Sequence, residues 1–178
     1  MIVRTLVVVA VLIAGVLIFA ATKPKTFRIE RTTMIDAPPE RIFALLNDFH
    51  NWPMWETLDR RDATIKRTFS GSASGAGAIS EWAGSGSTGK GRMSITKSVA
   101  PSIVAVMADW EKPFVAHNLN EFTLEPHGRT TKLTWTMQGT NVYVMKLMSV
   151  FVNMDRFMGK HFEAGLASLK SAAETGGH

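Results

Sequence analysis

The chain has 178 residues, enough for one membrane segment and one domain of ordinary size. Apolar residues make up 46% and charged residues 20%, which predicts a folded core and excludes an intrinsically disordered chain. The absence of cysteine excludes disulfides, thiolate nucleophiles and zinc–thiolate sites. The formal charge is +5 and the basic residues are scattered, so we expect no nucleic-acid partner and favour contact with an anionic lipid surface.

An uninterrupted apolar run extends from Leu6 to Ala21. A retained single-pass anchor, a cleaved signal peptide and a core helix are the three interpretations. Cleavage after Ala21 would place Phe19 at position −3, where a small residue is needed. A core helix would have no polar face for solvent. We therefore expect a single-pass membrane anchor or signal-anchor over 1–25. Ile2, Val3 and the snorkelling side chains of Arg4 and Lys23 extend the run to the roughly 20 residues that a span needs.

The side of the membrane follows from the flanking charges. Lys23, Lys25, Arg28 and Arg31 follow the run and outnumber the positive charges before it. The positive-inside rule then favours a cytoplasmic domain, although a short signal-anchor of this kind can also export its domain.

Short helices and strands are expected over the rest of the chain. Alternating residues at 26–36 predict a first strand, and Pro38-Pro39 opens a short helix. Two tryptophans, Trp52 and Trp55, lie in a second short helix or turn. Six more strands, divided by Gly/Ser turns, are expected near 64–70, 77–83, 89–98, 102–112, 115–126 and 130–139. Sequential strands of this kind form an antiparallel, strongly curved meander.

The alternation within these strands predicts which side chains face the core. The expected inner face consists of Ile79, Met93, Ile95, Val104, Val106, Phe122, Leu124, Leu133, Trp135 and Met137.

The stretch from Asn141 to Ala173 predicts one long amphipathic helix without proline. Its apolar stripe comprises Val144, Leu147, Met148, Phe151, Met154, Met158, Phe162, Gly165, Leu166 and Leu169. Residues 142–158 are apolar almost all round, so we expect that half to contact more than the sheet: the short helices, the bilayer or a cavity mouth. Residues 175–178 are expected to form a disordered tail.

Motifs for chemistry are few. A glycine-rich segment at 84–91 nearly spells a phosphate-binding loop, but Gly91 stands where Ser or Thr is needed and a strand follows, so we expect a hairpin turn. The histidines form no His-x-x-x-His or His-Glu-x-x-His pair, and we expect no metal and no cofactor. There is also no Gly-x-Ser-x-Gly elbow, so no catalytic residue can be named.

Two amides share the strand parity of Phe122 and Leu124, and we expect Asn118 and Asn120 to point inward. A buried amide needs hydrogen-bond partners. Backbone groups or water can supply them, or the amides can orient the oxygen atoms of a ligand inside an apolar pocket.

Methionine packs adaptably, so a Met-rich wall suits a variable apolar ligand, although gap-filling in a core is commoner. The tryptophans also suit either role. The candidate ligand-binding residues are Asn118, Asn120, Trp82, Met93, Val106, Trp110, Phe122, Trp135, Met137, Phe151, Met154 and Met158.

A family resemblance rests on several segments. Residues 35–43 (IDAPPERIF), 45–48 (LLND) and 52–55 (WPMW) resemble the opening of the START-like SRPBCC superfamily. Residues 112–114 (KPF) and 153–166 (NMDRFMGKHFEAGL) resemble its polyketide-cyclase-like bacterial branch. The resemblance covers about residues 27–173 of the expected domain at 26–174.

The resemblance implies an α+β helix-grip fold: a curved antiparallel sheet around a long C-terminal helix, with an apolar cavity between them. Here one N-terminal transmembrane helix would precede it. The resemblance implies little about activity, because the superfamily includes binders, transporters and enzymes.

Three functions remain open. The leading hypothesis is a membrane-anchored protein that binds or carries an apolar small molecule, such as a lipid, quinone or polyketide-like compound. Its partners would be that ligand and membrane lipid. The alternatives are a cyclase, dehydratase or hydrolase that polarises a carbonyl with Asn118, Asn120 or another polar group of the cavity, and a partner-binding module at the membrane with a small or filled cavity. The oligomeric state is not specified by the sequence.

Overall fold

The computed structural model describes residues 2–56, 62, 64–112 and 115–175, except for the side chains of Ser87 and Met154. Pro113 and Phe114 of the predicted 112–114 turn lie outside this part, as does the tail beyond Thr175, which itself ends the last helix.

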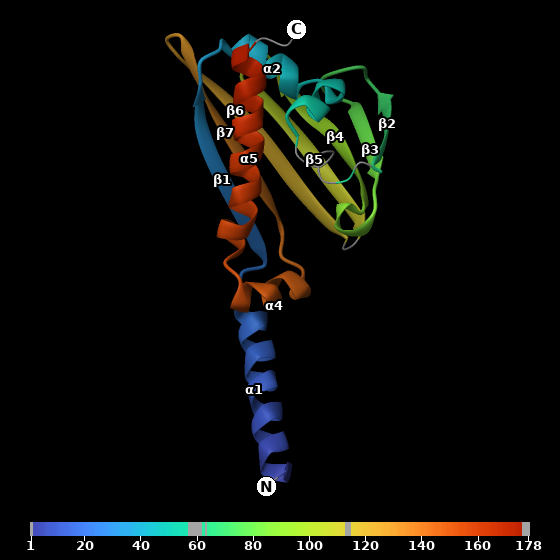
Figure 1. The fold of residues 1–178 in the computed structure, drawn as a ribbon, viewed down its shortest axis with the longest axis vertical. Coiled ribbons are helices and arrows are strands. Elements are labelled where there is room, and N and C mark those ends of the chain that lie inside the picture. Colours follow the sequence, from blue (N-terminus) through green and yellow to red (C-terminus); the bar gives the residue numbers. More distant parts are fainter. Residues whose placement is uncertain (1, 57–61, 63, 113–114, 176–178) are drawn as a thin grey trace.

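The N-terminal helix α1 (Ile2–Thr22) projects from the domain along the long axis of the molecule (Figure 1). It is long and apolar enough to cross a membrane. Among its described residues Ala20 alone is buried, so α1 is not a core helix. Lys23, Pro24 and Lys25 connect it to the first strand.

The domain is built on one antiparallel sheet of seven strands, ordered β1-β7-β6-β5-β4-β3-β2. The strands are β1 (Thr26–Ile35), β2 (Lys66–Gly71), β3 (Ala78–Ala83), β4 (Lys90–Val99), β5 (Ile103–Lys112), β6 (Ala116–His127) and β7 (Thr130–Thr140). Each begins and ends within two residues of its predicted range. Strand β1 closes the meander by pairing with β7, from Thr26 opposite Thr140 to Ile35 opposite Thr131.

The buried face of the sheet agrees with the predicted alternation except in β3. There Ala78, Ser80 and Trp82 are buried, whereas Ile79 is half-buried on the opposite face. The prediction for Ile79 was therefore wrong. Its side chain lies beside Gly71 of β2, near the edge of the sheet.

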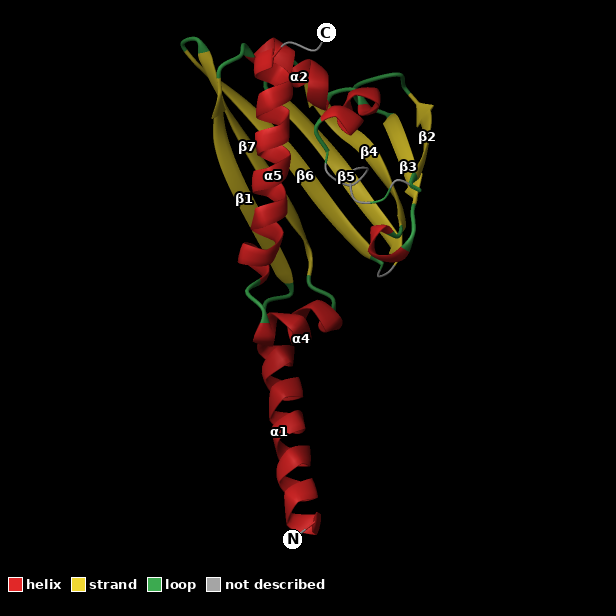
Figure 2. Ribbon diagram, in the orientation of Figure 1, coloured by secondary structure: helices red, strands yellow, loops and turns green. Residues whose placement is uncertain are grey.

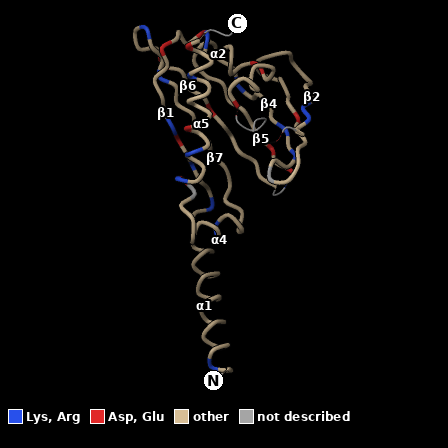
Figure 3. Tube along the Cα trace, viewed as in Figure 1, with Lys and Arg blue, Asp and Glu red and all other residues tan. Residues whose placement is uncertain are grey.

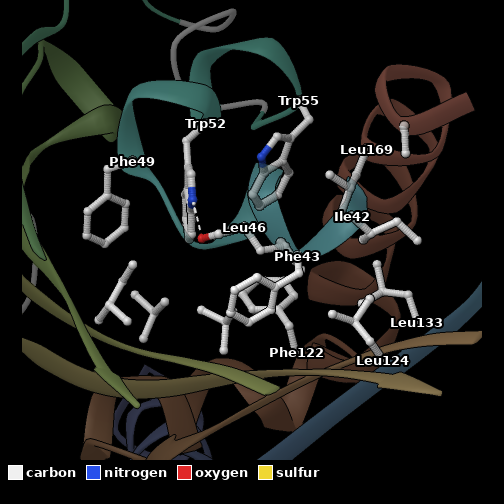
Figure 4. Packing of buried hydrophobic residues seen from close by; sticks show 14 of the residues in the cluster. Ile42, Phe43, Leu46, Phe49, Trp52, Trp55, Phe122, Leu124, Leu133 and Leu169 are labelled. Atoms are coloured by element: carbon white, nitrogen blue, oxygen red, sulfur yellow. Dashed lines mark hydrogen bonds between the residues drawn. The ribbon is translucent and has the colours of Figure 1, made fainter. Parts of the chain in front are cut away.

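Two short helices cover part of the inner face: α2 (Pro39–Leu46) and the 3₁₀ helix η1 (Phe49–Met54). Pro38 and Pro39 begin α2, where a missing N–H costs nothing. The indole Nε1 of Trp52 donates to the Leu46 carbonyl over 3.0 Å (Figure 4). That bond fixes η1 on α2 and directs the tryptophans toward Phe122 of the sheet, 6.1 Å from each ring centre.

The predicted single helix over Asn141–Ala173 is two helices, α4 (Tyr143–Phe151) and α5 (Met154–Thr175) (Figure 2). Val152 is extended at the break. The Asn153 side chain then accepts from the Arg156 N–H over 3.0 Å, which is an N-cap. Helix α5 lies on the sheet with Phe162, Leu166 and Leu169 buried. Helix α4 turns away and packs against α1, which leaves Val144, Met148 and Phe151 of the predicted stripe exposed.

Helix α5 is fastened to β1 by Arg31. Its guanidinium donates to Asp155 and Glu163 over 3.0 Å each. The resulting hydrogen bonds lower the pKa of the Asp155 carboxyl. Gly159 of α5 lies directly beneath the Arg31 guanidinium, which a Cβ at this position would overlap. At Gly165 the absence of a side chain lets the helix approach Trp135, whose ring would be 3.0 Å from a Cβ.

Candidate functional site

An inner cavity of about 210 Å³ lies between α5, η1 and the concave face of the sheet. Its lining is mostly apolar and includes all five tryptophans of the chain. The lining residues are Trp52, Trp55, Glu56, Trp82, Met93, Ala108, Trp110, Asn120, Trp135, Met137, Met158, His161, Phe162 and Gly165.

Aromatic stacking holds the walls of this cavity. Trp135 of β7 stacks on Phe162 of α5, with ring centres 4.1 Å apart and planes 5° apart. At the far wall Trp82 meets Trp110 edge to face at 4.9 Å. The Trp82 ring can lie there because its neighbour across the strands, Gly91, has no side chain to obstruct it. Rings fixed in this way leave the remaining space unfilled.

Asn120 is the buried polar residue of the cavity, at 8% exposure. Its Oδ1 accepts from the Trp135 indole over 3.0 Å. The Nδ2 has no hydrogen-bond partner among the described residues. In the described part of the chain, every side-chain nitrogen or oxygen that is fully enclosed has a hydrogen-bond partner. The Nδ2 lacks one, so it is not fully enclosed and is open to the cavity. It can therefore donate to an oxygen of a bound molecule.

Two titratable groups also border the cavity, Glu56 and His161. Glu56 pairs with Arg67 of β2 over 3.3 Å, and both side chains are largely shielded from solvent, at 19% and 8% exposure. His161 is half-buried on α5, against Phe157. The cavity is thus apolar with three polar groups at its border.

A larger outer pocket of about 700 Å³ adjoins the inner cavity. It lies where the ends of β1 and β7 meet α4 and the segment that follows α1. Trp110, Met137 and Met158 line both spaces, so these three side chains form the boundary between them. A molecule that passes between them reaches the inner cavity from the α4 end of the domain.

The candidate residues whose side chains are described divide into three groups. Seven line the inner cavity: Trp82, Met93, Trp110, Asn120, Trp135, Met137 and Met158. Asn118 and Phe151 line the outer pocket instead, and Asn118 occupies the space that the missing side chain of Gly139 leaves. Val106 and Phe122 belong to the packed core and line neither space, and the Met154 side chain lies outside the described part.

Several lining residues were absent from the candidate list. Trp52, Trp55 and Glu56 come from η1 and the two residues after it, and His161 and Gly165 come from α5, so strand alternation carries no information about them. The helix stripe did include Phe162 and Gly165, so the spacing of that stripe is the signal that could have placed them at the site.

The structure gives no support to a metal site in the residues it describes, where no three His, Asp or Glu side chains form a cluster. The glycine-rich segment forms the turn between β3 and β4, with a 3₁₀ helix, η2 (Gly86–Thr88). Asp62 fixes this turn, accepting from the Ser85 N–H over 2.6 Å and from Thr64. These hydrogen bonds, led by that of the Thr64 hydroxyl, lower the pKa of the Asp62 carboxyl well below its usual range.

A family model described as "Polyketide cyclase / dehydrase and lipid transport" matches residues 26–174. The chain belongs to this family. The family supports a role in hydrophobic ligand binding or a cyclase-like role. Among curated proteins none matches the chain.

Solved structures of the SRPBCC/helix-grip type share the fold of this chain. Protein CV1439 from Chromobacterium violaceum is 15% identical with a TM-score of 0.58, over 85% of this chain and 99% of its own. The Aha1 dimer from Colwellia psychrerythraea is 19% identical with a TM-score of 0.61, over 85% and 99%. The di-domain ARO/CYC StfQ of the steffimycin biosynthetic pathway is 8% identical with a TM-score of 0.61, over 85% of this chain and 51% of its own. At these identities the likeness shows the fold.

Proposed function

We propose that this protein binds or carries an apolar small molecule, such as a lipid, quinone or polyketide-like compound, and that α1 anchors it in a membrane. The observation that carries the proposal is the inner cavity, a space walled by aromatic and methionine side chains with one open donor, the Asn120 Nδ2.

The sizes of the two spaces suggest how a ligand is divided between them. The inner cavity, at about 210 Å³, is smaller than the roughly 300–1,000 Å³ of typical small-molecule sites, whereas the outer pocket, at about 700 Å³, falls within that range. We infer that an apolar ring or chain end occupies the inner cavity and the remainder of the ligand lies in the outer pocket. The adaptable side chains at the boundary, Met137 and Met158, suit such a divided ligand.

Polar recognition in this arrangement falls to Asn120. Because its Oδ1 is fixed by the Trp135 indole, its Nδ2 has a set direction and selects ligands with an oxygen at that depth. A hydrocarbon without such an oxygen would leave the donor unpaired, at a cost of about 1–3 kcal/mol.

The tryptophans that line the cavity make occupancy measurable. The full chain is purified in detergent and titrated with N-phenyl-1-naphthylamine, and energy transfer from tryptophan to the probe is recorded. Native mass spectrometry and solvent extraction of the same sample identify any apolar molecule that co-purifies. We expect saturable transfer, and bound apolar material in the untreated protein.

A cavity-filling variant supplies the control. Ala108 lines the inner cavity and is buried, whereas Ala167 is exposed on α5. We expect Ala108→Phe to weaken probe binding at least about tenfold, or 1.4 kcal/mol, and Ala167→Phe to leave it unchanged. Equal affinity of both variants, or no saturable binding by the unaltered chain, would contradict the proposal.

A second function, a cyclase or dehydratase acting on such a ligand, is favoured by the polar border of the cavity. Asn120 could polarise a ligand carbonyl while Glu56 or His161 transfers a proton, and all three line the same space. The test incubates the protein with a linear poly-β-ketone thioester and follows, by mass spectrometry, the loss of water that accompanies ring closure and dehydration. If turnover occurs with the unaltered chain and is lost in His161→Phe and Glu56→Gln, the enzyme hypothesis replaces simple binding.

We also propose that the domain lies on the cytoplasmic side, because Lys23, Lys25 and Arg28 directly follow α1. A reporter fused after His178 tests this. Activity of a reporter that works only outside the cytoplasm would overturn it.

A further inference from the structure

Helix α4 has an apolar face that the rest of the described chain leaves uncovered. Val144 and Met148, one turn apart, are 46% and 42% exposed and line neither space, whereas the exposed Phe151 and Val152 at the end of the helix line the outer pocket. Lys146 is the one charged residue in the sequence of this helix. A short helix with this composition is unfavourable in water, so its outer face is expected to contact an apolar phase.

Another face of α4 borders the ligand space. Met145 and Ser149, together with Val142 just before the helix, line the outer pocket. The helix is therefore a thin wall that has the pocket along one face and leaves Val144 and Met148 uncovered on another.

A contact with α1 sets the depth of this wall. The Tyr143 hydroxyl donates to the Leu17 carbonyl over 2.9 Å. Leu17 precedes the end of α1 at Thr22 by five residues, which corresponds to about 7 Å of helix. Interfacial helices bury their apolar face about 5–10 Å into the headgroup and acyl boundary, and tyrosine is enriched at that level. Helix α4 thus lies at the height where a bilayer crossed by α1 would end.

The charges around the junction fit a negatively charged surface. Lys25, Lys146 and Arg156 have no carboxylate partner among the described residues, and Lys23 lies 4.6 Å over the Phe19 ring. The neighbouring Asp155 is already paired with Arg31. Figure 3 shows the basic residues around this end of the domain.

We propose that α4 lies in the headgroup layer of an anionic bilayer crossed by α1, with Val144 and Met148 in lipid, so that the outer pocket opens to lipid and not to water. The ligand then exchanges between bilayer and cavity beside α4 without crossing the aqueous phase. This inference rests on the proposed membrane anchor and ligand.

The placement of α4 can be measured on the full chain, which has no cysteine to interfere. Val144→Cys, Met148→Cys and, as control, Ala167→Cys on the exposed side of α5 each carry an NBD fluorophore in nanodiscs of phosphatidylcholine and phosphatidylglycerol in equal parts. We expect nitroxide-labelled lipid to quench at 144 and 148 and aqueous iodide to quench at 167. Iodide quenching at 144 and 148 equal to that at 167 would overturn the proposal. Shielding from both quenchers would also overturn it, because α4 would then be covered by protein.

Exchange is tested with the Val144→Ser/Met148→Ser variant, whose altered side chains line neither space. We expect transfer of N-phenyl-1-naphthylamine from nanodisc to cavity to slow at least about tenfold, with unchanged affinity in detergent. An unchanged transfer rate would overturn the portal. Failure of the proposed function would give a different result: the unaltered chain would not bind the probe in detergent. The quenching experiment would still report where α4 lies.

Discussion

The Oδ1 of Asn120 on β6 accepts a hydrogen bond from the indole Nε1 of Trp135 on β7, 3.0 Å away inside the cavity wall. The bond orients the amide, and it satisfies an indole whose ring is stacked on Phe162. Structure and ligand recognition therefore depend on the same pair.

Replacing this amide is expected to destabilise the fold. In Asn120→Ala the Trp135 N–H loses its acceptor, and we expect the free energy of unfolding to fall by about 1–2 kcal/mol in urea denaturation. The control is the cycle with Trp135→Phe. In the Trp135→Phe background, Asn120→Ala should lower the free energy of unfolding by less, because the indole donor is already absent. If the effects of the two substitutions on the free energy of unfolding simply add, the coupling is refuted.

Gly159 is predicted to resist a substitution that normally stabilises helices. Alanine gains about 1 kcal/mol over glycine in a helix interior. Here its Cβ would displace the Arg31 guanidinium from Asp155 and Glu163. We expect Gly159→Ala to lower the free energy of unfolding by about 1 kcal/mol, a modest value because both carboxylates are exposed.

The sign of this effect is expected to reverse when Arg31 is absent. In an Arg31→Ala background, Gly159→Ala should raise the free energy of unfolding by up to about 1 kcal/mol. If the alanine destabilises both backgrounds equally, Arg31 is not the cause.

The break between α4 and α5 is predicted to depend on its cap. Asn153→Ala leaves the Arg156 N–H without an acceptor and should lower the free energy of unfolding by about 1 kcal/mol. Asn153→Ser keeps a capping oxygen and serves as the matched control. It should lower the free energy of unfolding by only a few tenths of a kcal/mol. Thermal unfolding by circular dichroism measures both, and equal losses would show that the cap is not responsible.

The turn held by Asp62 should weaken at low pH. Hydrogen bonds from Thr64 and Ser85 lower the pKa of this carboxyl, so its contribution to stability is complete above the unfolded pKa, about 3.9, and is lost as the pH falls below it. Asp62→Asn should lower the melting temperature at pH 7, and the difference from the unaltered chain should narrow below about pH 4. A difference that is constant from pH 7 to pH 3 would contradict the assignment.

Much of the fold could be predicted because strand alternation and glycine-rich turns are local signals. The range expected at 102–112 is β5 (Ile103–Lys112), and the range at 130–139 is β7 (Thr130–Thr140). The helix break was missed because apolar spacing continues across Val152 and Asn153, although an asparagine followed by Asp155 is a recognisable cap signal. Ile79 was misassigned because one apolar residue does not set strand parity, and Trp82 in the same strand was the better guide.

The candidate site was only partly predictable, for a different reason. Alternation indicates that Phe122 and Met93 both face inward, but it does not show that Phe122 is enclosed by other side chains and that Met93 borders empty space. That difference depends on how η1 and α5 fill the concave face. It arises from volumes contributed by segments far apart in the chain, which no local pattern contains.

The pairing of β1 with β7 also determines the order in which the protein can be completed. Thr26 pairs with Thr140, and at 5–20 residues per second roughly a hundred residues of synthesis separate the two strands by about 5–20 s. Strand β1 follows α1 after three residues and is synthesised well before β7, the strand with which it pairs. Closure of the sheet is then a late event in biosynthesis, and we expect truncation before β7 to leave β1 open to pairing with other chains.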